Sequence, residues 1–170
     1  MKKFFRDNLP KPEDLKKYRA LNVLGDSIFE KSLWVINKYT LSRALAIGLF
    51  WGWMPMFFQM IPAAFCAVYF RANLPLSLAG VWISNPITMP PMMYIGYEFG
   101  NLILGIDPLF DKFEASLEWI GSVFSLIWEP LIVGTFIIGV LSAVVGFFGV
   151  HLFWKIIAYR KLKKIKNSIR

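Results

Sequence analysis

Eight polar residues lie inside or beside long uncharged stretches of this chain, where polar groups are costly and often functional. They are Arg43, Gln59, Arg71, Asn73, Ser84, Asn85, Thr88 and Glu98. The two arginines carry the charge that a lipid phosphate needs, and Asn85 lies in a proline-rich loop. The competing interpretation is that the arginines only extend toward the membrane surface and that the prolines only shape the fold.

Catalytic chemistry finds no support in the sequence. His151 is the single histidine, and no carboxylate or nucleophile lies near it in the chain, so an interfacial or packing role is expected. A Ser/His/Asp triad would have to draw its serine and aspartate from opposite faces of the membrane. The single cysteine, Cys66, provides neither a disulfide nor a thiolate metal site. We expect no enzyme activity, catalytic residue, metal or cofactor.

Three uncharged runs dominate the chain and must position these polar residues. Residues 44–70, 72–97 and 131–154 contain no Asp, Glu, Lys or Arg and are 27, 26 and 24 residues long. About 20 apolar residues suffice for a helix to cross a membrane. Hydrophobic residues make up 56% of the sequence, which exceeds the share in a soluble domain. These features predict an integral membrane protein.

The charged residues predict how the chain is oriented. Residues 1–43 carry ten Lys or Arg against five acids, residues 155–170 carry seven against none, and residues 98–129 carry one against six. Because Lys and Arg beside membrane segments stay in the cytoplasm, we expect both ends inside and the acidic segment outside. The net charge is +8, and the basic residues flank membrane segments. This arrangement favours anionic lipid over nucleic acid as a partner.

Two cytoplasmic ends require an even number of crossings, so one of the three runs must fail to cross. Proline removes a backbone donor and breaks helices, and only the first two runs contain internal prolines. The predicted structural breaks are Pro55, Pro62, Pro86, Pro90 and Pro91. Either the first run is re-entrant and the second crosses, or the reverse. We favour the reverse, with a new half-helix starting near Pro91.

The two breaks are expected to meet inside the protein. Non-helical backbone at membrane depth must be sheltered from lipid. A helix that starts there would offer bare N–H groups and its positive dipole end to an anion. A short similarity between residues 48–55 and 80–86, each with Gly, Trp and Pro in that order, hints at two related hairpins, although chance explains a match of that length equally well.

Three amphipathic segments are expected on the membrane surfaces. Ser27 and Glu30 fit a capping box for a helix carrying Phe29, Leu33 and Ile36. A second apolar stripe at helical spacing comprises Phe113, Leu117, Ile120, Phe124 and Ile127, and the basic tail extends the third run as a helix. Small residues at Thr135, Gly139 and Ala143 should let the third run pack closely on the broken segments, with self-association as the alternative.

The sequence thus predicts an all-α integral membrane protein with two full crossings, at least one proline-broken re-entrant hairpin and interfacial helices. Residues 1–42 form a basic cytoplasmic segment with an interfacial helix, and residues 43–154 form the membrane domain. Within that domain lie broken segments 44–70 and 72–106, an outer acidic amphipathic segment 107–129 and a crossing helix 130–154. Residues 155–170 form a basic cytoplasmic tail. Two crossings enclose little volume, so a homo-oligomer is expected.

One proline-rich string supports a family resemblance. Residues 82–91 read Trp-Ile-Ser-Asn-Pro-Ile-Thr-Met-Pro-Pro, preceded by Pro55, Gln59 and an Arg-Ala-Asn-Leu-Pro string at residues 71–75. Over residues 29–155 the chain resembles the bacterial domain-of-unknown-function family 2062. The resemblance implies a small inner-membrane protein. Some relatives are joined to glycosyltransferase modules, which implies a lipid-linked substrate and an envelope glycosyltransferase as a partner.

These observations lead to three functional hypotheses. The favoured one is recognition or transbilayer movement of an anionic lipid, a polyprenyl phosphate or a phospholipid, at a site formed by the broken segments. The alternative is a non-transporting membrane scaffold or assembly factor for an envelope enzyme complex. A small ion channel is the third.

Overall fold

The computed structural model describes residues 30–56, 58–107 and 117–168. All regular structure in these ranges is helical: a 3-10 turn η2 (Lys31–Trp34) and the helices α3 (Lys38–Trp53), α4 (Met60–Tyr69), α5 (Leu74–Val81), α6 (Met89–Leu104) and α7 (Leu117–Ser168). Ser27 and Phe29, predicted to start a surface helix, and Phe113 lie outside the described residues. The all-helical prediction is therefore confirmed for the described ranges.

The first uncharged run doubles back on itself. α3 ends at Trp53, the chain turns around Pro55, and α4 returns it to the start of α3. There the Arg43 guanidinium donates to the Phe70 carbonyl at 3.0 Å, and the Asn73 N–H donates to the Thr40 carbonyl at 3.1 Å. The first run therefore returns to its own beginning, whereas the choice of which run crosses the membrane stays a prediction.

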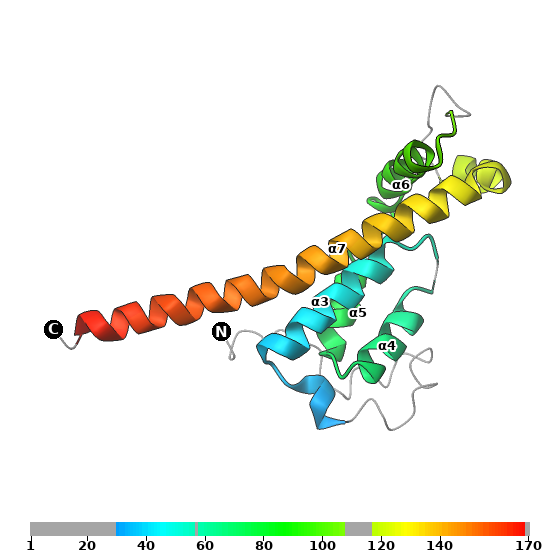
Figure 1. Ribbon diagram of the computed structural model, residues 1–170. Coiled ribbons are helices and arrows are strands. Elements are labelled where there is room, and N and C mark those ends of the chain that lie inside the picture. Colours follow the sequence, from blue (N-terminus) through cyan, green and yellow to red (C-terminus); the bar gives the residue numbers. More distant parts are fainter. Residues whose placement is uncertain (1–29, 57, 108–116, 169–170) are drawn as a thin grey trace.

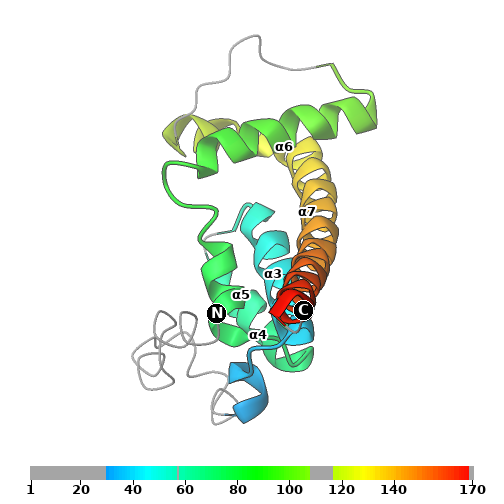
Figure 2. The same ribbon diagram turned by 90° about the vertical axis from the view of Figure 1, so that its left-hand side faces the viewer.

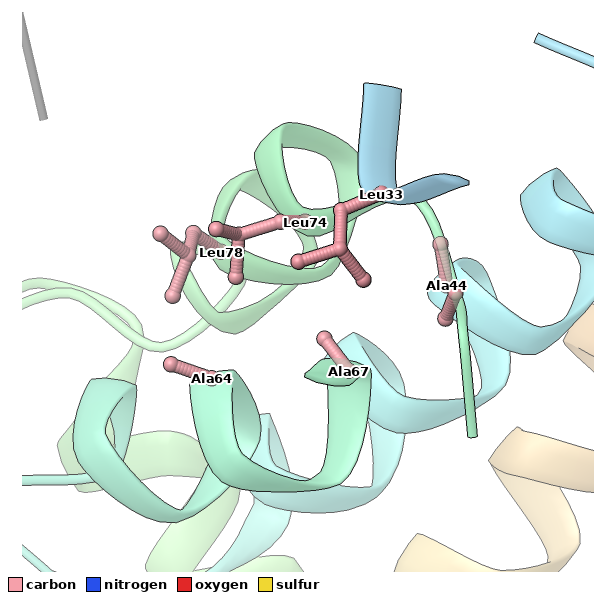
Figure 3. Packing of buried hydrophobic residues seen from close by; sticks show 7 residues of the cluster. Leu33, Ala44, Ala64, Ala67, Leu74 and Leu78 are labelled. Atoms are coloured by element: carbon pink, nitrogen blue, oxygen red, sulfur yellow. The ribbon is translucent and has the colours of Figure 1, made fainter. Parts of the chain in front are cut away.

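α5 then runs side by side with α3 in the same direction. The pairing is close because glycines face each other: a Cβ added at Gly48 would lie 2.7 Å from the Gly80 Cα and from the Ser77 carbonyl oxygen. Ala64, Ala67 and Leu74 are fully buried where α4 covers this pair, as Figure 3 shows. Small side chains on α4 thus allow α3, α4 and α5 to pack closely around a common set of buried residues.

α6 and α7 form the other half of the molecule. Figure 2 shows α6 lying crosswise beyond the far ends of α3 and α5, with the first part of α7 beside it. The chain turns near Pro130, which lies inside α7, and the long part of α7 then runs back past α3 in the opposite direction (Figure 1). Gly139 lies against Phe50 and Trp53, and Gly146 against Leu45 and Leu49. The predicted small-residue packing on the broken segments is confirmed at Gly139, and Gly146 packs in the same way.

α7 also carries the membrane signal of the described residues. Within it, residues 127–160 form a 34-residue stretch that contains an 18-residue window of mean hydropathy 2.5, and the stretch is long and apolar enough to cross a membrane by length and composition. The predicted extension of this helix into the basic tail is confirmed as far as Ser168, and the predicted outer segment joins the same helix from Leu117 onward.

Three local predictions need correction. The surface helix over residues 27–38 is not continuous in its described part, because η2 ends at Trp34 and Val35 is extended (φ −72°, ψ 132°). Pro62 is not a break, since it lies in the first turn of α4, where no intrahelical donor is lost. Pro90 is likewise not a break, since it lies in the first turn of α6, and Pro91 beside it confirms the half-helix predicted to start there. Pro55 and Pro86 are the predicted breaks that do lie between helices.

The start of α3 depends on one asparagine. The Asn37 carboxamide oxygen accepts the N–H groups of Tyr39 and Thr40 at 2.8 and 2.9 Å. We predict that Asn37→Ala lowers the free energy of unfolding by about 1 kcal/mol, the usual contribution of such a cap, whereas Asn37→Asp retains an acceptor and loses less. Thermal unfolding in detergent micelles measures both. Equal losses for the two variants would contradict the capping role.

Candidate functional site

The two interruptions meet at one cavity, as predicted. Gln59 lies between α3 and α4, and Ser84 lies between α5 and α6; the Ser84 hydroxyl donates to the Gln59 carboxamide oxygen at 2.8 Å. The Gln59 carboxamide nitrogen donates to the Met54 carbonyl. Beside them is a cavity of about 320 Å³ lined by Met56, Gln59, Met60, Val81, Trp82, Ser84, Asn85, Pro86 and Met89. Gln59 is only 6% exposed, so this is a sheltered polar position.

Asn85 and Thr88 form reciprocal hydrogen bonds in the turn that leads into α6. The Asn85 carboxamide oxygen accepts the N–H groups of Ile87 and Thr88, both at 3.0 Å. The Thr88 hydroxyl accepts the Asn85 N–H at 2.9 Å and donates to the Ile83 carbonyl at 2.7 Å. The expectation that this loop offers bare amides to an anion was therefore wrong, because asparagine side chains at helix starts take up those donors.

The two arginines lie elsewhere, at the beginning of α3. Arg43 reaches the Phe70 carbonyl from α3, and Arg71 follows directly in the turn after α4, with a left-handed backbone (φ 49°). Neither lines the cavity between the breaks. The prediction that an arginine supplies charge at that cavity was wrong. Because the first run doubles back, its two ends lie together, and both arginines lie there and not at the turn around Pro55.

A groove of about 450 Å³ contains both arginines. Its lining residues are Ser32, Val35, Asn37, Tyr39, Thr40, Arg43 and Arg71. No carboxylate is among them, so nothing in the lining neutralises the two guanidinium groups. The Ser32 hydroxyl is buried and has no hydrogen-bond partner among the described residues. Such a polar group is costly to leave unpaired, and a ligand atom would satisfy it.

Asn73 and Glu98 have other positions. Asn73 is 1% exposed and caps α5, accepting the Leu76 N–H at 3.0 Å, while its amide nitrogen donates to the Val35 carbonyl at 3.4 Å. Its hydrogen bonds thus connect α5 with α3 and with the residue that follows η2. Glu98 is half-buried on α6 and lines neither space. Of the eight predicted site residues, three line the cavity (Gln59, Ser84 and Asn85), two line the groove (Arg43 and Arg71), and three line neither space (Asn73, Thr88 and Glu98).

One signal in the sequence was missed. The Asn-Pro-Ile-Thr string that leads into α6 has a counterpart 48 residues earlier, where Asn37 and Thr40 lie at the start of α3. Thr40 accepts the Asn37 N–H at 3.2 Å and donates to the Val35 carbonyl at 2.6 Å, which repeats the bonds of Thr88. The same spacing relates Gly48 and Gly52 to Gly96 and Gly100. The similarity proposed between residues 48–55 and 80–86 used a different register, and Gly48 and Gly80 instead contact each other.

His151 contributes to packing between α7 and the start of α3. Its ring lies edge-on to Tyr39 with centroids 5.8 Å apart and is tilted against Phe147 at 4.9 Å. No group of three or more His, Cys, Asp or Glu residues in the described part of the chain could hold a metal ion.

The described structure is therefore that of an all-helical, membrane-associated protein in which two spaces beside the interrupted apolar segments each contain polar side chains. The chain belongs to domain-of-unknown-function family 2062, a bacterial family described as an uncharacterized protein conserved in bacteria, whose model matches residues 21–163. Comparison with curated proteins and with solved structures gave no match.

Proposed function

We propose that this protein binds an anionic lipid through its phosphate and moves the headgroup across the bacterial inner membrane. The observation that carries the proposal is the groove at the start of α3, where Arg43 and Arg71 lie with no carboxylate in the lining. The lipid is a polyprenyl phosphate or a phospholipid, which share the phosphate that the groove would recognise.

The chemistry of the groove supports a phosphate in particular. A guanidinium group presents several N–H donors in a planar fork, which suits the oxygens of a phosphate and forms strong charge-assisted hydrogen bonds. One N–H of the Arg43 guanidinium donates to the Phe70 carbonyl, and this bond fixes the position of the side chain. The other N–H donors of this guanidinium are available to a phosphate. The unpaired Ser32 hydroxyl adds a neutral donor or acceptor to the same groove.

The membrane layout in this proposal follows from the charges and the chain path. Both basic ends lie in the cytoplasm. The doubled-back α3–α4 segment is a re-entrant hairpin that opens to the cytoplasm with the arginine groove at its mouth. The α5 half-helix with its proline loop, and then α7, provide the two crossings. Supporting this layout, Phe70 returns to Arg43 and α7 runs back past α3.

The cavity between the breaks is the proposed intermediate position of the headgroup. It lies at the opposite end of α3, a helix of 16 residues and hence about 24 Å long. The cavity offers neutral hydrogen-bonding groups from Gln59, Ser84 and Asn85, and its three methionines give it an adaptable apolar wall. A phosphate leaving the arginines would thus meet three neutral hydrogen-bonding side chains near the far ends of the broken helices.

Substitution of Gln59 tests the second position. We expect Gln59→Leu to lower the rate of anionic lipid movement about tenfold, because about 1.4 kcal/mol, near the lower limit for a hydrogen bond to a charged group, corresponds to that factor. The rate is measured in proteoliposomes by loss of protected fluorescence after dithionite addition. One set of vesicles carries labelled phosphatidylglycerol and the other a labelled polyprenyl phosphate.

Ser77→Ala provides the matched control for this experiment. The Ser77 hydroxyl is buried and donates to the Asn73 carbonyl at 3.0 Å, yet Ser77 does not line the cavity. Its substitution should leave the rate near that of the wild type. A wild-type protein that moves neither lipid would argue against transport, and the scaffold hypothesis would then take its place.

A further inference from the structure

A third space on the described surface lies between the start of α3 and the end of the apolar part of α7. This groove of about 720 Å³ is lined by Lys38, Val145, Phe148, Gly149, His151, Leu152, Trp154, Lys155 and Ala158. It is separate from the arginine groove, since the two share no lining residue. Lys38 and Tyr39 are neighbours in α3 but line different grooves.

We infer that this groove binds the headgroup and one acyl chain of an acidic phospholipid, which acts as a resident structural lipid and not as the transported one. The groove has the two chemical halves that such a lipid requires. Lys38, His151 and Lys155 form a basic, hydrogen-bonding end, and Val145, Phe148 and Leu152 form an apolar side.

The basic end holds an unpaired polar atom. The Nε2 atom of His151 is buried and has no hydrogen-bond partner among the described residues, although the ring itself is held by Tyr39 and Phe147. A phosphate oxygen is an acceptor of the kind that a protonated imidazole nitrogen requires. The Lys38 ammonium lies 4.6 Å from the centre of the Tyr39 ring, which keeps it near the same end.

The apolar side of the groove opens onto the surface that α7 presents to its surroundings. Val145 is 71% exposed, Phe148 64% and Leu152 60%, so these side chains are covered by nothing in the described part of the protein. They precede Lys155 by one to three helical turns, which matches a headgroup at the membrane surface and an acyl chain running toward the membrane centre. A soluble anion would use only the basic end and would leave this apolar side bare.

The test compares two double variants that each remove two positive charges. Lys38→Gln/Lys155→Gln alters the groove, whereas Lys31→Gln/Arg160→Gln removes two exposed charges that line neither groove. Native mass spectrometry in detergent is used with added dioleoyl phosphatidylglycerol or dioleoyl phosphatidylcholine. We expect the wild type and the Lys31/Arg160 variant to retain one phosphatidylglycerol in preference to phosphatidylcholine, in addition to any lipid at the arginine groove, and the Lys38/Lys155 variant to retain this additional lipid about tenfold less.

His151→Phe supplies a second measurement that does not depend on net charge. Phenylalanine keeps the ring contacts with Tyr39 and Phe147 but removes Nε2, so phosphatidylglycerol retention should fall severalfold while the thermal midpoint does not fall. Equal retention by the two charge variants, or unchanged retention by His151→Phe, would overturn the inference. Failure of the transport proposal would leave these results unchanged, because the arginine groove and the Gln59 cavity are intact in every variant used.

Discussion

Gly134→Ala is expected to lower the free energy of unfolding by about 3 kcal/mol, at the upper end of the cost of overpacking a close-packed interface. A Cβ at this position of α7 would lie 1.8 Å from the Gly96 carbonyl oxygen and 2.7 Å from the Gly100 nitrogen. Both obstacles are backbone atoms of α6, so no side chain can rotate aside. The helices would have to separate, and the loss is measured as a fall in the thermal midpoint in detergent.

Gly149→Ala is the control, since it makes the same substitution in the same helix. A Cβ at Gly149 would meet nothing within 4 Å. Because alanine has a higher helix propensity than glycine, the free energy of unfolding should be unchanged or slightly raised. If Gly134→Ala were as stable as Gly149→Ala, the close pairing of α6 with α7 would be contradicted. That pairing matters for the site because α6 begins at the cavity between the breaks.

The second large effect is expected at the arginine groove. Arg43→Gln/Arg71→Gln should weaken binding of a phosphate-bearing lipid about 30-fold. Two charge-assisted contacts are lost, and their contribution of about 1.5 to 3 kcal/mol each is reduced by exposure to water, which leaves about 2 kcal/mol in total. The dissociation constant is measured by titrating the detergent-solubilised protein with phosphatidylglycerol and, separately, with a short-chain polyprenyl phosphate.

The arginine variant also lowers the net charge by two, so a control variant with the same loss of charge is needed. Lys31→Gln/Arg160→Gln is that control. That variant has the same net charge as the arginine variant but leaves the groove unaltered. It should bind the phosphate-bearing lipid with nearly wild-type affinity. A parallel weakening in both variants would mean that binding depends on overall charge alone, and the groove would not be the site.

The sequence predicted where the apolar runs are interrupted, because proline acts locally. Pro55 and Pro86 lie between helices, as expected from the missing backbone donor and the steric restriction on the preceding residue. It also predicted that the two interruptions would meet, since polar backbone inside a membrane must be sheltered by protein. The hydrogen bond between Gln59 and Ser84 confirms that the interruptions meet, and their depth in the membrane stays a prediction.

The choice of which run doubles back could not be made from the sequence. Counting crossings fixes only that one run fails to cross. The outcome depends on long-range contacts such as the bond from Asn73 to Thr40 and the close approach of Gly48 to Gly80, which no local pattern reveals. The location of Arg43 and Arg71 follows from that choice, and for this reason their separation from the cavity was not foreseen.

The role of the asparagines was hidden for a different reason. Asn85 was interpreted as a binding residue because polar groups at membrane depth are often functional. Its carboxamide oxygen instead accepts the N–H groups of Ile87 and Thr88 in the turn that leads into α6, whereas Asn37 caps the first turn of α3. Comparison of residues 35–52 with residues 83–100 would have shown the shared pattern in advance, since Asn, Thr and two glycines recur at one constant spacing.

The most direct measurement is native mass spectrometry of the wild-type protein gently extracted from its own membranes, with the arginine-groove variant prepared in parallel. Besides the lipid inferred for the groove on α7, we predict that the wild type carries a second co-purified lipid bearing a phosphate, identified by its mass, and that Arg43→Gln/Arg71→Gln has lost this second lipid. Wild-type protein that carries no second lipid, or a variant that keeps as many lipids as the wild type, would contradict the proposed phosphate site.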